Sequence, residues 1–502
     1  MTTKPAVLLH PSGTAVSFDD LDAAANRLAR FFGGAGLTPG DTVAVLMENN
    51  EHIHAVMWAA RRSGLYYTMV NTHLSAAEIA YIIDDSGAKA VVASKNMLCE
   101  EIADALPGGL PDIALVADAS VPGWRRYPEC VQDESPDRVV GEIDGQLLQY
   151  SAGSTGRPKG IRRPMNPAAG QSVPLTTPVF QALGVTSESV YLSPAPTYHT
   201  APAMWTMAAQ SVGATVVMME RFDPEQALDC IQRYGVTHAQ FVPTMFVKML
   251  RLPEATRRSF DVSSLQRVVH AAAPCPPAIK RQMIDWWGPI VDEYYGSSEG
   301  AGISFIRAEE WLEHPGSVGK PMMGVPHILD DNGNELPAGE VGEIYYEGGY
   351  PFEYLNDDAK TAAARTPQGW VTVGDVGFVD SDGYLYLTDR RHHMIISGGV
   401  NIYPQEIENE LVAHPLVVDA AVFGIPDEVM GQSVKAVVQL ADPSQATDDL
   451  AQKLIGWLRE RLAHYKCPKS ISFEPQLPRT DAGKLYKKTL IEKYSGSGVL
   501  QQ

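Results

Sequence analysis

Short apolar runs alternate with amphipathic segments over roughly the first hundred residues of this chain. The apolar runs 42–47, 66–70 and 88–94 have the length of buried strands. Segments 17–32, 52–63 and 76–84 carry apolar residues at helical spacing and precede these runs in turn. Strands that alternate with helices form a parallel sheet with crossover helices. The sequence therefore predicts an α/β fold. The stretch 107–145 has mixed polarity and several prolines, and we expect it to be rich in loops.

The length and charge of the chain limit its domain number and its partners. Its 502 residues exceed what one hydrophobic core holds, so we expect two or more domains. The formal net charge of −20 argues against nucleic acid or an anionic membrane as a partner. This net charge does not exclude a small basic pocket that binds a nucleotide.

The cysteines and the chain ends indicate a cellular compartment. Cysteines occur at five scattered positions, which fit a reducing cytoplasm and show neither a disulfide framework nor a zinc motif: Cys99, Cys130, Cys230, Cys275 and Cys467. The start has no apolar signal segment, no apolar run is long enough to cross a bilayer, and the end has no peroxisomal tripeptide or lipidation box. We therefore expect a cytoplasmic protein with no integral membrane association.

A glycine-rich stretch, 150–160, has the composition of a loop that binds a polyphosphate. It combines three glycines, three hydroxyls and two cations: Gly153, Gly156, Gly160, Ser151, Ser154, Thr155, Arg157 and Lys159. Glycines let the backbone approach a ligand, and successive N–H groups, hydroxyls and a lysine surround phosphate oxygens with donors. The alternative is a mobile surface turn. The stretch is not a GxxxxGK[ST] loop, since no Ser or Thr follows a Gly-Lys pair.

Two later motifs carry side chains suited to a nucleotide. In the stretch 291–300, Tyr295 can stack on adenine, Ser298 can donate to a phosphate, and Glu299 is a hard oxygen ligand suited to Mg²⁺. Asp375 follows a predicted strand and stands between glycines, where its carboxylate can accept both ribose hydroxyls. Taken alone, each motif is also explained by a strand-end turn or an Asx-turn.

The order and spacing of these motifs resemble the adenylate-forming (ANL) superfamily, which contains acyl-CoA synthetases, luciferases and peptide-synthetase adenylation domains. The resemblance covers essentially the whole chain, and the stretches 397–404 and 426–431 look most like the acyl-CoA synthetase or fatty-acid-CoA ligase type. It implies an α/β fold with a large N-terminal domain, 1–390, of stacked α/β sheets and a β-barrel-like subdomain over 316–349. A small mobile α+β C-terminal domain, 391–502, is implied to carry the catalytic lysine and one side of the CoA tunnel.

The same resemblance assigns roles to residues. The implied catalytic residues are Lys484, His199 and Glu299, with Glu299 and Thr155 at the metal. Nucleotide and phosphate binding is implied for Ser151, Ser154, Thr155, Gly156, Lys159, Ala272, Ala273, Pro274, Glu293, Tyr294, Tyr295, Gly296, Ser297, Ser298, Asp375 and Arg390. CoA binding is implied for Ser397, Gly398, Gly399 and Asn401, and the acyl pocket for Tyr198, His199, Trp205, Phe241, Thr244 and Ala271.

Two positions depart from the pattern of the superfamily. Glu293 stands where relatives usually carry Asn or Gln near the adenine amino group, and a carboxylate can still accept that N–H. His392 stands at the hinge, where relatives carry Asp or Lys. Because histidine titrates near neutral pH, domain rotation could depend on pH. Simple tolerance of the substitution is the alternative.

The implied activity is ATP- and Mg²⁺-dependent activation of a carboxylic acid through an acyl-adenylate, followed by thioester formation with coenzyme A. Three consecutive alanines, 271–273, leave room in the acyl pocket, and Met204, Trp205 and Phe246 supply an apolar wall. This favours a medium-sized or bulky hydrophobic acid, while aromatic acids stay open. The alternatives are an enzyme specialised to one half-reaction, transfer to a separate carrier protein, a light-emitting oxygenase and a non-catalytic homologue. The expected partners are the acid, ATP and CoA, without nucleic acid, and a homodimer is compatible with the sequence.

Overall fold

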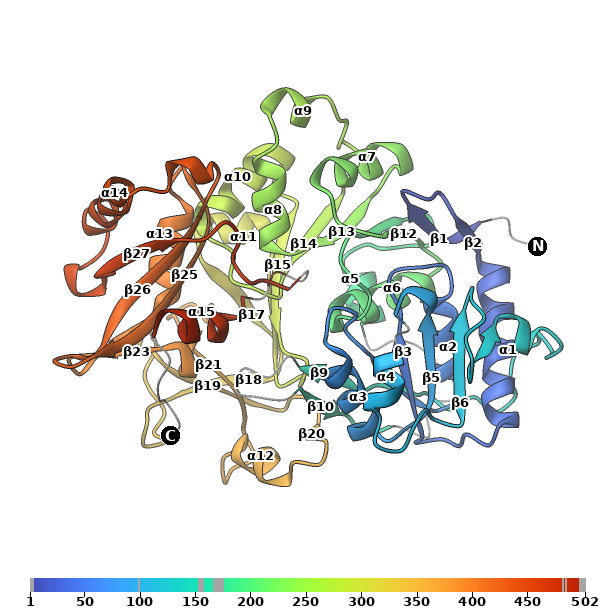
Figure 1. Ribbon diagram of the computed structural model, residues 1–502. Coiled ribbons are helices and arrows are strands. Elements are labelled where there is room, and N and C mark those ends of the chain that lie inside the picture. The colour runs from blue at the N-terminus through green and yellow to red at the C-terminus, as the bar shows by residue number, and fades with distance from the viewer. Residues whose placement is uncertain are drawn as a thin grey trace. The chain divides into compact units, whose positions relative to one another are not determined.

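The computed structural model describes residues 4–97, 100–151, 158–165, 176–480, 483 and 485–495 (Figure 1). The chain forms two compact units. The first comprises Met1–Gln240, Pro253–Val268 and Tyr350–Ala363, and the second comprises Phe241–Leu252, Val269–Gly349 and Ala364–Gln502. The predicted domain boundary after residue 390 stays a prediction.

A six-stranded parallel sheet of order β7-β6-β5-β3-β4-β8 forms one half of the first unit. Its strands are β3 (Thr42–Leu46), β4 (Tyr66–Met69), β5 (Ala88–Ser94), β6 (Ile113–Ala117), β7 (Arg125–Tyr127) and β8 (Gln146–Leu147). The helices of this half are α1 (Phe18–Gly34), α2 (Ile53–Arg62), α3 (Ala76–Asp85) and α4 (Glu100–Ala105). The predicted strands and helices of the first hundred residues are confirmed, as is the parallel sheet that they form.

Side-chain caps fix the starts of two of these helices. The Ser17 side chain accepts the backbone N–H of Asp20 at 3.1 Å at the start of α1. At the start of α3, Ser75 and Glu78 form a reciprocal capping box. Each cap satisfies backbone donors that the first helical turn leaves without a partner, which explains why these helices begin where they do.

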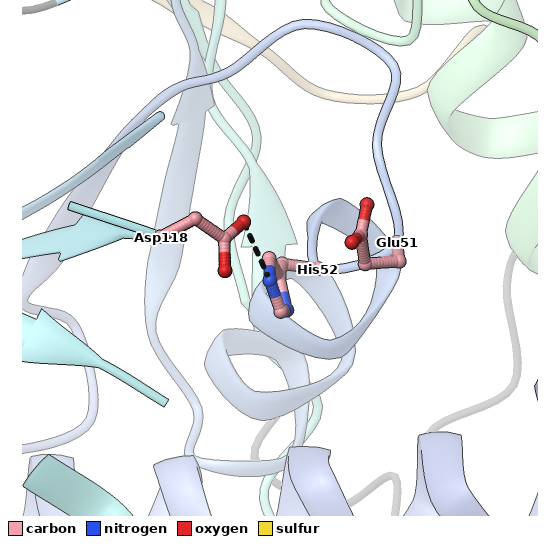
Figure 2. A group of neighbouring side chains, drawn as sticks. All are labelled: Glu51, His52 and Asp118. Atoms are coloured by element: carbon pink, nitrogen blue, oxygen red, sulfur yellow. Dashed lines mark hydrogen bonds and ion pairs between the residues drawn. The ribbon is translucent and has the colours of Figure 1, made fainter. Parts of the chain in front are cut away.

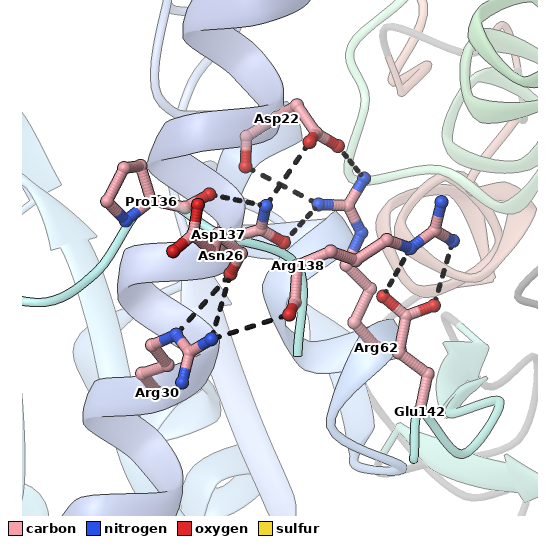
Figure 3. A network of polar contacts seen from close by, with 8 residues as sticks. All are labelled: Asp22, Asn26, Arg30, Arg62, Pro136, Asp137, Arg138 and Glu142. Atoms are coloured by element: carbon pink, nitrogen blue, oxygen red, sulfur yellow. Dashed lines mark hydrogen bonds and ion pairs between the residues drawn. The ribbon is translucent and has the colours of Figure 1, made fainter. Parts of the chain in front are cut away.

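The stretch 107–145 consists mostly of loops around two short strands. It contains β6, whose five residues are all buried, and β7. Figure 3 shows how its last part is held against α1: the buried Asn26 amide donates to the Pro136 carbonyl at 2.8 Å, and Arg30 donates to the Asp137 carbonyl at 3.1 Å. Arg62 of α2 in turn donates to the side-chain oxygen Oδ1 of Asn26 at 2.6 Å. Most of this stretch is loop, as predicted, and polar side chains from two helices anchor its last part.

The other half of the first unit contains a second group of strands. Strands β13, β11, β12 and β1 are parallel neighbours in that order, and β2 pairs antiparallel with β1. Their bounds are β1 (Pro5–His10), β2 (Ala15–Ser17), β11 (Val190–Ser193), β12 (Thr215–Met219) and β13 (His238–Phe241). A small sheet of order β20-β10-β9 joins β9 (Gln149–Ser151), β10 (Lys159–Arg162) and β20 (Glu353–Tyr354). The remaining helices of the unit are α5 (Thr177–Ala182), α6 (Thr200–Ser211), α7 (Pro224–Tyr234), α9 (Glu254–Arg258) and α12 (Asp358–Ala363).

The second unit is built on an antiparallel run of strands, β18-β19-β21-β22-β17-β16-β15. Their bounds are β15 (Val291–Gly296), β16 (Ile303–Ile306), β17 (Ser317–Met323), β18 (Val325–Leu329), β19 (Gly342–Glu347), β21 (Val371–Val379) and β22 (Leu385–Arg390). Helices α8 (Pro243–Leu250), α10 (Pro277–Trp287) and α11 (Ala308–Glu313) belong to the same unit, and β14 (Arg267–His270) begins in the first unit and ends in the second. The β-rich subdomain predicted over 316–349 corresponds to β17, β18 and β19.

The C-terminal residues of the second unit form a sheet that is covered on both faces. Its strands are β23 (Ile395–Ser397), β24 (Val400–Ile402), β25 (Val417–Asp427), β26 (Gly431–Leu440) and β27 (Ser470–Phe473). Ala420 and Val422 pack with α13 (Pro404–Val412) and α14 (Asp448–Arg459), whereas Ala421 and Phe423 pack with α15 (Lys487–Tyr494). Alternate residues of one strand face opposite sides of the sheet, so β25 contributes to both cores. In Figure 1, α15 lies across the sheet from α13 and α14.

No helix in the described part of the chain is both long enough and apolar enough to span a membrane.

Candidate nucleotide-binding site

The glycine-rich stretch is presented by a β-hairpin in the first unit. Strands β9 and β10 are antiparallel neighbours, with Ser151 opposite Lys159 and Tyr150 opposite Gly160. A Cβ at Gly160 would lie 3.0 Å from the Leu355 Cβ and 3.1 Å from the Tyr150 ring, so this position has little room for a side chain. Ser151, the last residue of β9, and Lys159, the first residue of β10, therefore flank the predicted phosphate loop. Ser154, Thr155 and Gly156 lie outside the described residues.

Three predicted nucleotide residues meet in one cluster of the second unit. The Tyr295 hydroxyl of β15 donates to Asp375 Oδ2 at 2.6 Å, and Arg390 Nε lies 3.1 Å from Asp375 Oδ1. Asp375 and Arg390 are direct cross-strand partners on β21 and β22. Burial first, and then the Asp375 carboxylate, raise the pKa of Tyr295 well above its ordinary value, so the phenol stays a hydrogen-bond donor. The sequence identified all three residues but not the hydrogen bonds between them.

The turn that follows β15 carries the predicted phosphate and metal ligands. Tyr294, Ser297, Ser298 and Glu299 are half-buried, and Gly296 is exposed. The Ser297 hydroxyl is a buried donor that has no hydrogen-bond partner among the described residues. Such a group costs free energy unless a ligand satisfies it, which marks this turn as a place where a polar ligand fits.

The predicted adenine wall follows β14 and has a strained backbone. Ala272 is exposed and has a φ of 73°, in the left-handed region that non-glycine residues rarely adopt. Ala273 is half-buried and Pro274 is exposed, so this loop presents mostly small side chains to its surroundings. Strain of this kind is retained at functional sites more often than elsewhere. Glu293 is buried on β15, and its carboxylate accepts a hydrogen bond from the Lys280 ammonium at 2.7 Å.

The predicted acyl-pocket residues belong to aromatic clusters in each unit. In the first unit, the ring centroids of Tyr198 and His199 lie 4.6 Å apart, and those of Phe180 and Trp205 lie 4.8 Å apart. In the second unit, the Phe241 ring is buried and lies 5.7 Å from both Phe246 and Trp287. Ala271 is buried and Thr244 is half-buried.

The predicted CoA-binding residues form a tight hairpin turn. Gly398 and Gly399 connect β23 to β24 with φ values of 58° and 79°, and Ser397 pairs with Val400. Two successive positive φ values fit the two-residue turn that β-hairpins prefer, and only glycine adopts them without strain. The Gly398 N–H donates to the Met430 carbonyl at 2.8 Å, which attaches this turn to the end of β25–β26. Ser397 is half-buried and Asn401 is exposed.

Lys484 lies outside the described residues, but the residue before it is held firmly. The Arg479 guanidinium donates to the Gly483 carbonyl at 2.6 Å and to Asp419 Oδ1 at 2.7 Å. A Cβ at Gly483, whose φ is 79°, would lie 2.7 Å from the Thr244 hydroxyl oxygen. This places the backbone next to Lys484 against a predicted acyl-pocket residue. The sequence did not identify Arg479, although it lies in the same motif as the lysine.

The hinge segment is fixed by its neighbours. The side chain of His392 is not among those described. Arg391 forms ion pairs with Glu343 and, at 2.9 Å, with Asp331, and the backbone N–H of Gln405 donates to Asp389 at 3.1 Å. These contacts join the hinge to β19 and α13. Arg391 was not predicted, since its sequence context gives no indication of a partner 48 residues away.

A further polar cluster lies in the first unit. Figure 2 shows Glu51, His52 and Asp118, whose ligand atoms all lie within 4.8 Å of one another, with His52 Nε2 3.2 Å from Asp118 Oδ2. Glu51 and His52 precede the first residue of α2, where the partial positive charge of a helix N-terminus disfavours a cation. A hydrogen bond between His52 and Asp118 therefore explains the cluster without a metal.

Comparisons with known proteins agree with this geometry. The model of the AMP-binding enzyme family matches residues 2–353, and that of the AMP-binding enzyme C-terminal domain matches residues 406–484. The chain belongs to the AMP-binding enzyme family. It is thus a member of the adenylate-forming superfamily, of the acyl-CoA synthetase type, an AMP-forming acid–thiol ligase, and the predicted superfamily and fold are confirmed.

Individual relatives match over almost their whole length. Feruloyl-CoA synthase from an Amycolatopsis species is 34% identical over 485 residues, which cover 96% of this chain and 94% of that protein. Fatty acid–acyl-carrier-protein ligase ScoC from Streptomyces coeruleorubidus is 30% identical, with 99% of this chain and 95% of that protein covered. The structure of ATP-bound MatB from Rhodopseudomonas palustris superposes with a TM-score of 0.83 at 27% identity, over 99% of this chain and 97% of that one.

Proposed function

We propose that this enzyme uses ATP to activate a medium-sized or bulky hydrophobic carboxylic acid and then transfers the acyl group to the thiol of CoA. The observation that carries the proposal is the cluster of Tyr295, Asp375 and Arg390, in a chain that matches the AMP-binding enzyme family over residues 2–353. The cluster offers a nucleoside an aromatic face, a carboxylate for the ribose hydroxyls and a cation for phosphate or ribose oxygens.

The first half-reaction forms a mixed anhydride. A carboxylate oxygen of the acid attacks the α-phosphorus of ATP, and the bond to the pyrophosphate oxygen breaks. Negative charge moves onto the α-phosphoryl group and the leaving pyrophosphate, so catalysis depends on positioning and on donors that are already in place. We assign this stabilisation to Lys484, and the ribose to Asp375 and Arg390. His199 and Glu299 complete the proposed catalytic set.

The phosphates are assigned to the glycine-rich loop and to the turn after β15. The loop contributes Ser151, Ser154, Thr155, Gly156 and Lys159. The turn contributes Ser297 and Ser298, together with Tyr294 and Gly296 at the end of β15. The half-buried Glu299 carboxylate, with the Thr155 hydroxyl, offers the hard oxygen ligands that Mg²⁺ prefers. When bound there, Mg²⁺ would neutralise charge on the phosphates.

In the second half-reaction the CoA thiol attacks the acyl carbon, the bond to AMP breaks, and a thioester forms. We assign the pantetheine side to Ser397, Gly398, Gly399 and Asn401, whose turn is largely exposed. The hinge assignment of His392 and a mobile domain over 391–502 belong to the same proposal. A cytoplasmic location and a homodimer stay predictions.

The proposed hydrophobic character of the acid rests on the residues that are proposed to line its pocket. Tyr198 and Trp205 are buried aromatic residues of one unit, and Phe241 and Ala271 are buried residues of the other. Such a set favours an acid whose chain or ring displaces water from apolar surface. A relative, feruloyl-CoA synthase, is named for an aromatic acid, so the test panel should include both aliphatic and aromatic members.

The test is a pair of assays on the purified chain with ATP, Mg²⁺ and a panel of carboxylic acids. Pyrophosphate release would be measured with and without CoA, and the thioester identified by mass. We expect both products with a hydrophobic acid and neither with acetate. Efficient turnover of acetate would contradict the proposed pocket, and no pyrophosphate with any acid would contradict the proposed activity.

Transfer to a carrier protein is the second candidate. It is favoured by the 30% identity to ScoC, whose name gives an acyl-carrier protein as the acceptor. The two acceptors are distinguished by supplying CoA or a purified phosphopantetheinylated carrier protein to the preformed acyl-adenylate. We expect the thioester on CoA, and formation only on the carrier protein would favour this second candidate.

A further inference from the structure

A buried lysine lies beneath the predicted adenine-binding strands. Lys280 of α10 is completely buried, and its Nζ lies 2.7 Å from Glu293 Oε2 on β15. The same ammonium lies 4.8 Å from the centre of the Trp311 ring, which is also buried. A buried charge is stable only when it is paired, so the lysine and the carboxylate constrain each other.

A histidine completes the cluster on the neighbouring segment. His270, the last residue of β14, is completely buried, and its Nε2 lies 3.4 Å from Glu293 Oε2. Neither of its ring nitrogens makes a hydrogen bond with another described residue. Burial, together with the adjacent Lys280 ammonium, holds the pKa of His270 well below its ordinary value, so the ring is neutral. The close polar contact of the cluster is therefore that between Lys280 and Glu293, and burial raises the pKa of the Glu293 carboxyl against the opposing effect of the lysine.

These contacts enclose one loop. His270 immediately precedes the loop 271–276, and Lys280 follows it in the first turns of α10. Lys280 therefore ties the end of the loop to β15 through Glu293, and the His270 ring at the start of the loop packs beside the same carboxylate. The loop contains Ala272, whose strained φ of 73° requires support from its surroundings.

The same strand carries the tyrosine of the nucleotide cluster. Glu293 and Tyr295 are two residues apart on β15, and side chains at this spacing lie on one face of a strand, roughly 6–7 Å apart. Tyr295 is fixed at its hydroxyl by Asp375, and the strand beneath it is fixed by Lys280 through Glu293. The loop and the tyrosine ring thus share one support.

We propose that Lys280 is a positioning residue of the nucleotide site, which acts through Glu293 to hold the loop 271–276 and Tyr295 at the spacing that accepts the adenine base. The inference rests on the proposed function, because it takes this loop as the adenine wall. It adds a residue whose side chain is completely buried and is not proposed to touch the nucleotide. The expected consequence of its loss is weaker binding of the nucleoside, with little effect on binding of pyrophosphate or of the acid.

The test replaces the lysine by an apolar side chain of similar length. In Lys280→Met we expect the Kd for AMP, measured by calorimetry, and the KM for ATP to rise at least tenfold. The Kd for pyrophosphate, kcat and the KM for the acid should stay within about threefold of their wild-type values. The Tm should fall, because Glu293 is left buried without its partner. The matched control is Lys435→Met, another buried lysine, which donates to Ser472 at 2.7 Å on a different sheet. It should lower the Tm without changing the Kd for AMP.

A double variant separates position from stability. Lys280→Met combined with Glu293→Gln removes both buried charges, so the Tm should recover. Because Glu293 is itself predicted near the adenine amino group, the reference is Glu293→Gln alone, whose amide oxygen can still accept from Lys280. The Kd for AMP of the double variant should stay at least fivefold weaker than that of this reference, because Lys280 no longer ties α10 to β15. Recovery of both quantities, or an unchanged Kd for AMP in a folded Lys280→Met protein, would overturn the proposal. If the single variant does not fold, the double variant alone decides. Calorimetry measures AMP binding without turnover. Wild-type protein that binds AMP but activates no acid would contradict the proposed function. The AMP affinities of the wild type and the Lys280 variants could still be compared in that case.

Discussion

The Tyr295 hydroxyl lies 2.6 Å from Asp375 Oδ2, and this hydrogen bond connects β15 to β21, strands that begin 80 residues apart in the chain. The other carboxylate oxygen, Oδ1, lies 3.1 Å from Arg390. Asp375 is buried, so its carboxylate has little contact with water and its direction is set by these two partners. A ribose that binds to Asp375 therefore meets a carboxylate that is already oriented.

Replacing Tyr295 by Phe tests this orientation. The ring remains available to adenine, but Asp375 loses a donor. A hydrogen bond to a charged group contributes about 1.5–3 kcal/mol, so we expect the KM for ATP to rise by roughly tenfold or more. Steady-state pyrophosphate release measures it, with exposed Tyr465→Phe as the control. An unchanged KM for ATP in Tyr295→Phe would show that the hydrogen bond does not position the carboxylate.

Much of this site follows from local sequence. Tyr295 and Arg390 lie at the ends of strands, whereas Asp375, which was predicted to follow a strand, lies in the middle of β21. The order of the three residues along the chain indicates the superfamily. The hairpin turn at Gly398 and Gly399 also follows, because a Gly-Gly pair between two apolar runs favours such a turn. These features depend on residues that are close together in the sequence.

The contacts that were missed join distant segments. Lys280 pairs with a residue 13 positions away, across a helix and a turn. A signal was present: Lys280 shares the helical spacing of Met283, Ile284 and Trp287, all of them buried, and a lysine on an apolar face requires a buried partner. The partner itself depends on the packing of α10 against β15. Likewise, Arg479 and Asp419 are 60 positions apart, and only the tertiary structure brings them together.

Arg479 should affect only one half-reaction. Its guanidinium holds the Gly483 carbonyl at 2.6 Å, next to the proposed catalytic lysine. Lysine at this position keeps a positive charge but cannot bind Asp419 and the carbonyl together. In Arg479→Lys we expect acyl-adenylate formation to slow at least tenfold, while thioester formation from supplied acyl-adenylate stays within about threefold.

Single-turnover assays of the two steps measure this difference. The control is Arg461→Lys, because Arg461 stacks on Trp457 at 3.3 Å and is not proposed to touch the site. Equal slowing of both steps in Arg479→Lys would indicate a general loss of structure instead of a misplaced lysine.

His54 should make stability depend on pH. It is buried in α2, and burial lowers its pKa from 6.5 to about 4. The folded protein therefore keeps the ring neutral, whereas the unfolded chain binds a proton below pH 6.5. Stability from this residue is fully present above the unfolded pKa and is lost as the pH falls toward 4. A pKa unit corresponds to about 1.4 kcal/mol, so the loss should reach roughly 2–3 kcal/mol.

Urea unfolding of the wild type and of His54→Leu between pH 7.5 and pH 4.5 measures this loss. We expect the difference in unfolding free energy between the two proteins to shift in favour of the variant as the pH falls. A constant difference across this range would show that His54 does not titrate as its burial predicts. His464→Leu, a change on the C-terminal side of α14, is the control and should show no such trend.

Gly398 should matter for the second half-reaction. Its φ is 58°, and a Cβ there would lie 2.4 Å from the Met430 methyl carbon. In Gly398→Ala we expect thioester formation from supplied acyl-adenylate to slow at least tenfold, with acyl-adenylate formation nearly unchanged. Combining it with Met430→Ala removes the clash but leaves the strain of a left-handed alanine, about 1–2 kcal/mol, so recovery should be partial. The Tm should fall only by the few degrees that strain of this size causes. Equal slowing of both steps would contradict the assignment of this turn to CoA.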